Sequence, residues 1–206
     1  GHHSHRIFVK VQPIGHGFHG NGTLFVGNHP MKRGKRKLLA EIDITQIDFS
    51  ILNFIQEHLR CEFLDGFMPF ITKLGNAGFI WIVISVIFIC IPKYRRVGLT
   101  LGITLALSFV CYELILKNVI ARPRPFVQNP AFVLLIKAPS GFSFPSGHTT
   151  SAFCAATILF CFKNKLRVPV LVLAILIAFS RLYLYVHFPT DVLAGIIIGI
   201  LFGIFR

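Results

Sequence analysis

Apolar residues dominate the second part of this 206-residue chain and fall into five stretches, at residues 77–91, 97–116, 149–162, 168–184 and 192–205. Some of these stretches are shorter than the roughly 20 residues that a perpendicular crossing of a bilayer needs. Polar residues that flank them are expected to extend the helices at one end. We therefore predict an all-α integral membrane protein, a helical bundle of about five transmembrane helices.

The segment before the first apolar stretch has a different pattern. Between residues 38 and 65, six acidic residues interrupt the apolar ones, which recur at helical spacing. This pattern predicts an amphipathic interfacial helix that lies on the membrane and does not cross it. Its apolar positions are Ile44, Ile47, Ile51, Phe54 and Ile55.

These patterns divide the chain into three parts. Residues 1–30 are rich in His and Gly and have no hydrophobic period, so we expect an artificial leader or a disordered tail. Residues 31–65 hold a basic start and the amphipathic helix. Residues 66–206 are expected to form one membrane-embedded domain.

Composition agrees with a membrane protein, because 54% of the residues are hydrophobic and only 14% are charged. The net charge of +13 does not indicate a nucleic-acid partner. Its cations are spread over the N-terminal segment and short loops, and no basic patch interleaved with exposed aromatic residues is evident. Composition and charge also give no indication of an obligatory protein partner.

The residue types give no set of metal ligands. The five cysteines lack metal-ligand and redox spacing, and Glu113 and Asp191 are the only acidic residues after position 65. We expect no cofactor, no metal and no disulfide framework.

Three polar clusters interrupt the apolar stretches and carry the candidate chemistry. Ionisable groups in membrane segments are costly and are usually kept for a task. The three clusters supply the groups that cleavage of a phosphate ester or anhydride needs. These groups are a nucleophile, a general acid, an orienting carboxylate and several cations around the phosphoryl oxygens. The clusters are Lys117 with Arg124 and Pro125, then Pro145 to His148, then Ser180 and Arg181 with His187 and Asp191.

Local spacing predicts a geometry for two of these clusters. His187 and Asp191 are four residues apart at the start of the last helix. That step can place the carboxylate against one imidazole nitrogen and leave the other free to attack phosphorus. Ser146 and Gly147 precede a helix, whose free amides and dipole form an anion site.

The spacing of the three clusters resembles the three-part signature of the type 2 phosphatidic acid phosphatase superfamily, and the resemblance covers roughly residues 66–206. It implies metal-independent hydrolysis through a phosphohistidine. It also implies that His187 is the nucleophile, that Asp191 orients it, and that His148 protonates the leaving oxygen and then activates water. The residues expected to bind the substrate phosphate are Lys117, Arg124, Ser146, Gly147 and Arg181.

Residues near the signature have open roles. Arg122 is either a cation at the membrane interface or a second contact to a longer anionic head group. Glu113, one turn before Lys117, is expected to pair with Lys117 or Arg122 and to tune its position. The loop at residues 129–144 is either a lid or access route for a lipid chain, or a plain connector.

Basic loops predict the orientation of the bundle. The cations at residues 93–96 and 163–167 follow the first and third apolar stretches, so both loops lie on one face, which the positive-inside rule makes cytoplasmic. The three clusters then face the extracytoplasmic side. Basic residues 32–37 would share that outer face, against the rule, unless the amphipathic segment re-enters the membrane.

These inferences predict a multi-pass phosphatase of the bacterial plasma membrane that acts on a lipid phosphate or diphosphate. In architecture the chain resembles short bacterial undecaprenyl-diphosphate phosphatases, so undecaprenyl diphosphate is the preferred substrate. Phosphatidylglycerophosphate and phosphatidic acid are alternatives that the signature does not separate. An alternative of another class is a lipid-binding or lipid-flipping protein without turnover, against which the intact His148, His187 and Asp191 argue.

Overall fold

The structure is a computed structural model in which residues 33–205 are described, with side chains from residue 44 onward. Within that range the regular elements are all helical, as predicted. The predicted leader at residues 1–30 lies outside the described residues. The helices are α1 (Arg33–His58), α2 (Glu62–Leu74), α3 (Phe79–Cys90), α4 (Arg95–Phe109), α5 (Lys117–Ile120), α6 (Pro125–Gln128), α7 (Gly147–Cys161), α8 (Arg167–Tyr183) and α9 (Pro189–Ile204), with short turns η1 (Asn76–Gly78) and η2 (Pro92–Tyr94) and a π-helical segment η3 (Val110–Leu116).

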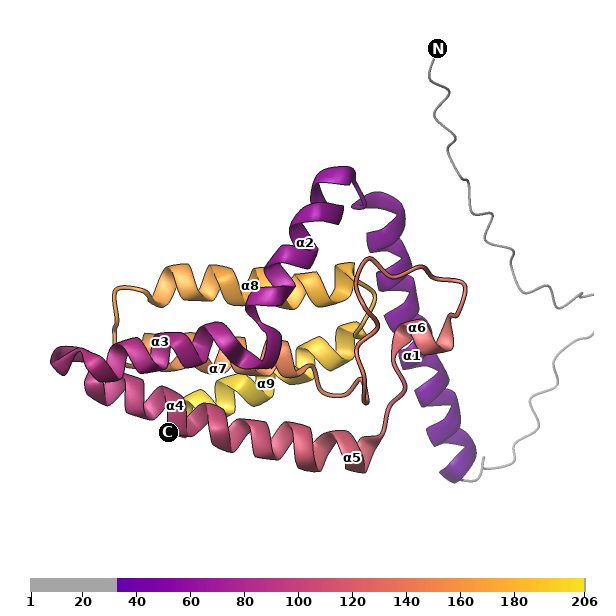
Figure 1. Cartoon of the computed structure of the whole chain (residues 1–206). Coiled ribbons are helices and arrows are strands. Elements are labelled where there is room, and N and C mark those ends of the chain that lie inside the picture. Colours follow the sequence, from indigo (N-terminus) through magenta and orange to yellow (C-terminus); the bar gives the residue numbers. More distant parts are fainter. Residues whose placement is uncertain (1–32, 206) are drawn as a thin grey trace, which may run out of the picture.

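The helices that contain the five apolar stretches form a bundle centred on α7, which packs against α9, α8 and α4 (Figure 1). α1 lies across one end of this bundle, and α2 leads from it back to α3. The α3–α4 and α7–α8 connections lie at the opposite end. The two predicted basic loops therefore share one face of the bundle.

Two parts of the described chain have the length and hydropathy of a membrane span. One is the stretch Pro92–Gln128, and the other is the pair Glu62–Leu74 and Asn76–Cys90, which is bent by 43°. α9 is apolar but shorter, and α7 and α8 have 15 and 17 residues. All five apolar stretches are helical, while the number of about five spans stays a prediction.

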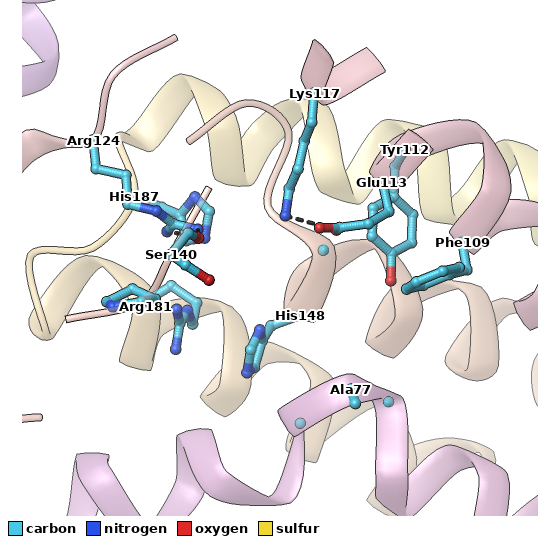
Figure 2. A pocket seen from close by; sticks show the side chains of 14 residues that line it. Ala77, Phe109, Tyr112, Glu113, Lys117, Arg124, Ser140, His148, Arg181 and His187 are labelled. Carbon is cyan, nitrogen blue, oxygen red and sulfur yellow. Dashed lines mark hydrogen bonds and ion pairs between the residues drawn. The ribbon is translucent and has the colours of Figure 1, made fainter. Parts of the chain in front are cut away.

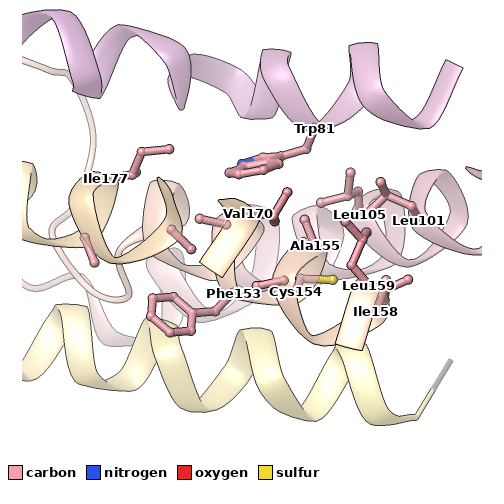
Figure 3. Packing of buried hydrophobic residues seen from close by; sticks show 14 of the residues in the cluster. Trp81, Leu101, Leu105, Phe153, Cys154, Ala155, Ile158, Leu159, Val170 and Ile177 are labelled. Atoms are coloured by element: carbon pink, nitrogen blue, oxygen red, sulfur yellow. The ribbon is translucent and has the colours of Figure 1, made fainter. Parts of the chain in front are cut away.

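The interior of the bundle is apolar and surrounds α7 (Figure 3). Ala152 and Ala155 of α7 are fully buried, and larger side chains reach them from the neighbouring helices. Trp81 comes from α3, Leu101 from α4 and Ile177 from α8, each of them also fully buried. Burial of these side chains holds the helices together around a narrow central one.

Large apolar side chains also cover the outside of the bundle. Phe79 of α3 is 65% exposed, Ile103 of α4 is 61% exposed and Leu193 of α9 is 56% exposed. Soluble monomers rarely expose large apolar patches. The exterior therefore fits contact with lipid.

α7 and α9 approach closely because α9 presents a stripe of glycines, Gly195, Gly199 and Gly203. A Cβ at Gly199 would lie only 2.5 Å from the backbone oxygen of Thr150 on α7. Small residues at this spacing let membrane helices come into backbone contact. The contact holds together the first turns of α7 and α9, where two of the polar clusters lie.

The predicted amphipathic helix is two helices, which corrects the sequence-based expectation. α1 ends at His58 and α2 begins at Glu62, so the predicted helix over residues 38–65 is interrupted. The expected boundary between residues 65 and 66 falls inside α2. The chain therefore turns before it enters the bundle.

α1 has one exposed apolar face and one face that packs on the bundle. Ile55, which was expected on the same membrane-facing apolar side as the other four positions, is 5% exposed and packs beside Tyr183 and Leu184. The other predicted apolar positions are exposed, and they are Ile44, Ile47, Ile51 and Phe54.

Gly199→Ala is expected to lower the free energy of unfolding by about 1–3 kcal/mol, because its Cβ would push α9 away from α7. Gly66→Ala in α2 is the matched control, since a Cβ there meets no heavy atom within 4 Å and Ala favours the helix. Thermal unfolding in detergent micelles compares the two. Equal midpoints would contradict the close packing of α7 and α9.

Candidate active site

A cavity of about 360 Å³ lies among η3, α7, α8 and the polar loops. It collects residues from all three predicted clusters (Figure 2). Asp191 and Ser146 lie outside its lining. The predicted site residues that line it are Glu113, Lys117, Arg124, Gly147, His148, Arg181 and His187.

His187 lies in the wall of the cavity with 2% of its surface exposed. Its Nε2 is 3.2 Å from Nη1 of Arg124. Because a guanidinium only donates hydrogen bonds, Nε2 accepts, and the proton of the neutral ring is on Nδ1. Nδ1 faces Oδ2 of Asp191 at 3.8 Å, which is too long for a hydrogen bond and short enough for electrostatic attraction.

The imidazole of His187 is neutral at physiological pH. Burial lowers its pKa to about 3; the nearby Asp191 carboxylate opposes this shift, and the positive charges of Arg181 and Arg124 add to it. A neutral imidazole with a lone pair on Nε2 is the form that attacks phosphorus.

Asp191 is fully buried, and other groups orient its carboxylate. Oδ2 accepts hydrogen bonds from Oγ of Ser143 at 2.5 Å and from the amide of Phe188 at 2.9 Å. Oδ1 accepts one from Nη1 of Arg122 at 2.7 Å. The carboxylate is thus fixed beside His187 without a direct hydrogen bond to it.

Arg124 is held by backbone carbonyl groups on both sides of the site. Its Nε donates to the oxygen of Gly141 at 2.9 Å, and its Nη2 donates to that of Ser140 at 3.1 Å. Its Nη1 also donates to the oxygen of Val186 at 2.9 Å. These bonds fix the planar guanidinium before any substrate binds.

Arg181 is the second buried guanidinium beside the cavity and is 3% exposed. Its Nη1 donates to Oγ1 of Thr72 on α2 at 2.6 Å, and its Nε has no partner among the described residues. Unused donors on a fixed guanidinium are suited to binding phosphoryl oxygens.

His148 lies in the first turn of α7, across the cavity from these arginines. Its Nε2 is 2.9 Å from Oδ1 of Asn76 in η1. Gly75 leaves room for the ring, because a Cβ there would lie 2.9 Å from Cδ2 of His148. Figure 2 shows His148 directed toward the segment that carries Ala77.

Lys117 forms one of the two alternative contacts that the sequence predicted for Glu113. Its Nζ donates to Oε2 of Glu113 at 2.6 Å. The π-helical η3 precedes Lys117 and brings Glu113 and Tyr112 to the cavity. The charge of Lys117 is therefore paired with a carboxylate, whereas Arg181 contacts the hydroxyl of Thr72.

The two residues before α7 differ in position. Ser146 is fully buried, its amide donates to the oxygen of Asp191 at 3.1 Å, and its Oγ is 2.9 Å from Oγ1 of Thr149. Its predicted contact with a substrate phosphate is therefore not supported by its position. Gly147 does line the cavity, and as the first residue of a helix its amide has no intrahelical acceptor.

Arg122 does not line the cavity, so its position favours neither predicted role. Its Nη2 donates to Oδ2 of Asp48 on α1 at 2.6 Å, while its Nη1 binds Asp191. Its guanidinium carbon lies 4.0 Å from the ring centroid of Phe188. Arg122 links two buried carboxylates.

The loop at residues 129–144 is one wall of the site rather than a free connector. Leu134, Leu135 and Ile136 pack on the core beside Met68. The carbonyl groups of residues 140 and 141 hold Arg124, as described above. The sequence left this role open.

Several residues that complete the site carried no signal in the sequence. Thr72, Asn76, Asp48 and Ser143 are common polar residues outside the signature, and their partners are far away in the chain. Among the described residues, no three His, Cys, Asp or Glu side chains are arranged to hold a metal ion.

Two histidines and several fixed cations that line one cavity, in a bundle with an apolar exterior, are the arrangement expected of a membrane enzyme acting on phosphorylated lipids. The family profile described as PAP2 superfamily matches residues 93–206. The chain belongs to this superfamily, which confirms the family predicted from the three clusters.

Known proteins similar to the chain are lipid phosphatases. An undecaprenyl-diphosphatase of Sulfolobus acidocaldarius is 33% identical over 153 residues, 73% of this chain and 71% of that protein. Undecaprenyl-diphosphatase BcrC of Bacillus subtilis is 34% identical over 141 residues, 68% and 72% of the two chains. The crystal structure of a transmembrane PAP2 type phosphatidylglycerolphosphate phosphatase from Bacillus subtilis matches with a TM-score of 0.66 at 29% identity, covering 79% of this chain and 84% of that chain.

His187→Gln is expected to make stability less dependent on pH. The pKa of His187 is about 3 in the folded chain and near its ordinary value of about 6.5 in the unfolded chain. The unfolded state therefore binds more protons between these values, and acid destabilises the fold. Lowering the pH from 8 to 5 should cost the native chain roughly 2 kcal/mol through this group.

Thermal midpoints of the two proteins at both pH values measure this difference. His58→Gln is the matched control for the loss of a histidine, because His58 is exposed on α1. If His187→Gln and His58→Gln lost stability equally on acidification, the depressed pKa of His187 would be refuted.

Proposed function

We propose that this protein is a metal-independent phosphatase that removes the terminal phosphate of a lipid diphosphate through a phosphohistidine intermediate. The observation that carries the proposal is the contact between Arg124 and Nε2 of His187. It places a fixed cation beside the attacking nitrogen. The hydrogen bond occupies the lone pair of Nε2, so it has to break when the phosphorus enters, and Nη1 can then donate to a phosphoryl oxygen. Arg181, with an unused Nε donor, lines the same cavity.

In the first half of the reaction, Nε2 of His187 attacks the terminal phosphorus. The N–P bond forms while the P–O bond to the lipid-linked phosphate breaks. Burial and the charge of Arg181 lower the pKa of His148 well below its ordinary value, so His148 takes up a proton only when the anionic substrate offsets them, and it transfers that proton to the leaving oxygen. Arg124, Arg181 and the amide of Gly147 stabilise the charge on the phosphoryl oxygens.

In the second half, water replaces the histidine. The phosphorylated ring of His187 is cationic because Nδ1 keeps its proton, and the carboxylate of Asp191 at 3.8 Å stabilises it. His148, now neutral, accepts a proton from water as the water oxygen bonds to phosphorus. The N–P bond breaks and inorganic phosphate leaves.

Undecaprenyl diphosphate is the substrate that we favour. Both curated relatives described above bear the name undecaprenyl-diphosphatase. A diphosphate also has a second phosphate, for which Lys117 is a cation apart from Arg124 and Arg181 in the cavity lining (Figure 2). Phosphatidylglycerophosphate is the second candidate, because the solved relative from Bacillus subtilis described above is a phosphatidylglycerolphosphate phosphatase.

The first test measures phosphate release by the purified chain in detergent with EDTA present. Undecaprenyl diphosphate, phosphatidylglycerophosphate and phosphatidic acid are compared by kcat/KM, and we expect the diphosphate to be preferred by at least tenfold. EDTA should not reduce turnover, since cations of the chain neutralise the phosphoryl charge.

His187→Ala is the control for this test and should abolish turnover, because no other nucleophile is in place. Activity that survives His187→Ala, or that EDTA removes and Mg²⁺ restores, would contradict the mechanism. A preference for either phospholipid would agree with the proposed mechanism and would contradict undecaprenyl diphosphate as the substrate.

We also infer that the site faces the extracytoplasmic side of a bacterial plasma membrane. The basic residues at 93–96 and 163–167 support this orientation, because their loops lie at the end of the bundle opposite α1 (Figure 1) and cations favour the cytoplasmic face. The site lies at the other end. A lipid diphosphate presented outside the cell would reach it directly.

Labelling of single cysteines tests the orientation in a background without the native cysteines. Val133→Cys, in the loop beside the site, replaces a residue that is 79% exposed and should react with a membrane-impermeant maleimide in intact cells. Lys165→Cys, in the α7–α8 connection, is the matched control and should react only after the membrane is broken. The reverse pattern would place the site in the cytoplasm and favour a phospholipid made on the inner leaflet.

A further inference from the structure

A buried carboxylate on α1 is connected to the catalytic carboxylate through one arginine. Asp48 is 1% exposed, and its Oδ2 accepts a hydrogen bond from Nη2 of Arg122 at 2.6 Å. Nη1 of the same guanidinium donates to Oδ1 of Asp191 at 2.7 Å. Asp48 also accepts hydrogen bonds from the amide and the hydroxyl of Thr190, at 3.0 and 2.5 Å.

We propose that Asp48 is a positioning residue, which acts through Arg122 and Thr190 to fix the carboxylate of Asp191 beside His187. The inference rests on the proposed phosphohistidine chemistry. α1 lies outside residues 93–206, which the family profile matches, so it contributes to the site from a separate segment.

The electrostatics explain why Asp48 matters. Two buried carboxylates, Asp48 and Asp191, share one cation, and each binds a different nitrogen of the planar fork of Arg122. Without Asp48, Nη2 of Arg122 loses its carboxylate, and Nη1 keeps Asp191 and Oγ1 of Thr190, a hydroxyl that Asp48 itself orients. Loss of Asp48 therefore leaves Asp191 with a less ordered partner.

Further contacts show that α1 braces the whole segment that carries His187. Nε2 of Gln56 donates to the carbonyl oxygen of Tyr183 at 2.8 Å. Tyr185 has a φ of 59°, in the left-handed region that residues other than glycine rarely adopt. Its hydroxyl donates to Oδ1 of Asn53 at 3.1 Å, and its ring stacks on Phe132 with centroids 4.0 Å apart. α1 thus contacts the segment at both ends and in the middle.

The test uses Asp48→Asn in the full chain. Asn has the same shape and still accepts from Thr190, but it removes the ion pair with Arg122. We expect kcat to fall roughly 10- to 100-fold with KM changed less than about threefold, as when a residue orients a reacting group without touching substrate. Glu57→Gln is the matched control, since it removes the same charge from an exposed position on α1 and should leave kcat and KM unchanged.

Two more variants separate positioning from folding. Asp48→Glu keeps the carboxylate and should retain more activity than Asp48→Asn at a similar thermal midpoint. The double variant Asp48→Asn with Arg122→Gln should be no worse than the more impaired single variant, because both changes break the same connection. Independent, multiplying losses would overturn the proposal.

Vanadate affinity, measured by calorimetry, gives a readout that needs no turnover. Vanadate adopts the five-coordinate geometry of the transition state, whereas inorganic phosphate does not. Asp48→Asn should weaken vanadate binding at least tenfold and leave phosphate binding within threefold. A native chain that binds vanadate but releases no phosphate would contradict the proposed function alone, and equal vanadate affinity in Asp48→Asn would contradict the role of Asp48.

Discussion

The buried negative charge of Asp191 is the constraint around which the polar end of the bundle is arranged. A carboxylate without any exposed surface is costly unless it is paired and hydrogen-bonded. Donors therefore reach it from the loop at Ser143, from its own helix start at Phe188, and from Arg122. Meeting this requirement joins segments that are far apart in the chain.

The apolar helices and this polar end depend on each other. Glycine residues let α9 lie against α7, so the amide of Ser146 reaches the carbonyl oxygen of Asp191. This bond uses a donor that an isolated helix start would offer to an anion. The same packing that brings the clusters together thus uses the amide of Ser146 inside the bundle, while Gly147 lines the cavity.

Prediction from sequence succeeded where the signal was local. Each of the five apolar stretches is helical, and the family followed from three short clusters with fixed spacing. The break between α1 and α2 was missed, because the apolar spacing continues through it. Contacts such as that of Asp48 with Thr190, 142 residues apart, were also missed, because they arise only when α1 is placed across the bundle.

The π-helical segment η3 sets the direction of the residues that follow it. Seven residues, Val110–Leu116, are wound more loosely than in an α-helix, and Lys117 comes directly after them. Each residue of an α-helix turns the chain by roughly 100°, so rewinding this segment would swing Lys117 around the helix axis without altering its spacing to Arg124. The direction of the Lys117 side chain therefore depends on the seven residues that precede the signature. Of these seven, only Tyr112 and Glu113 line the cavity.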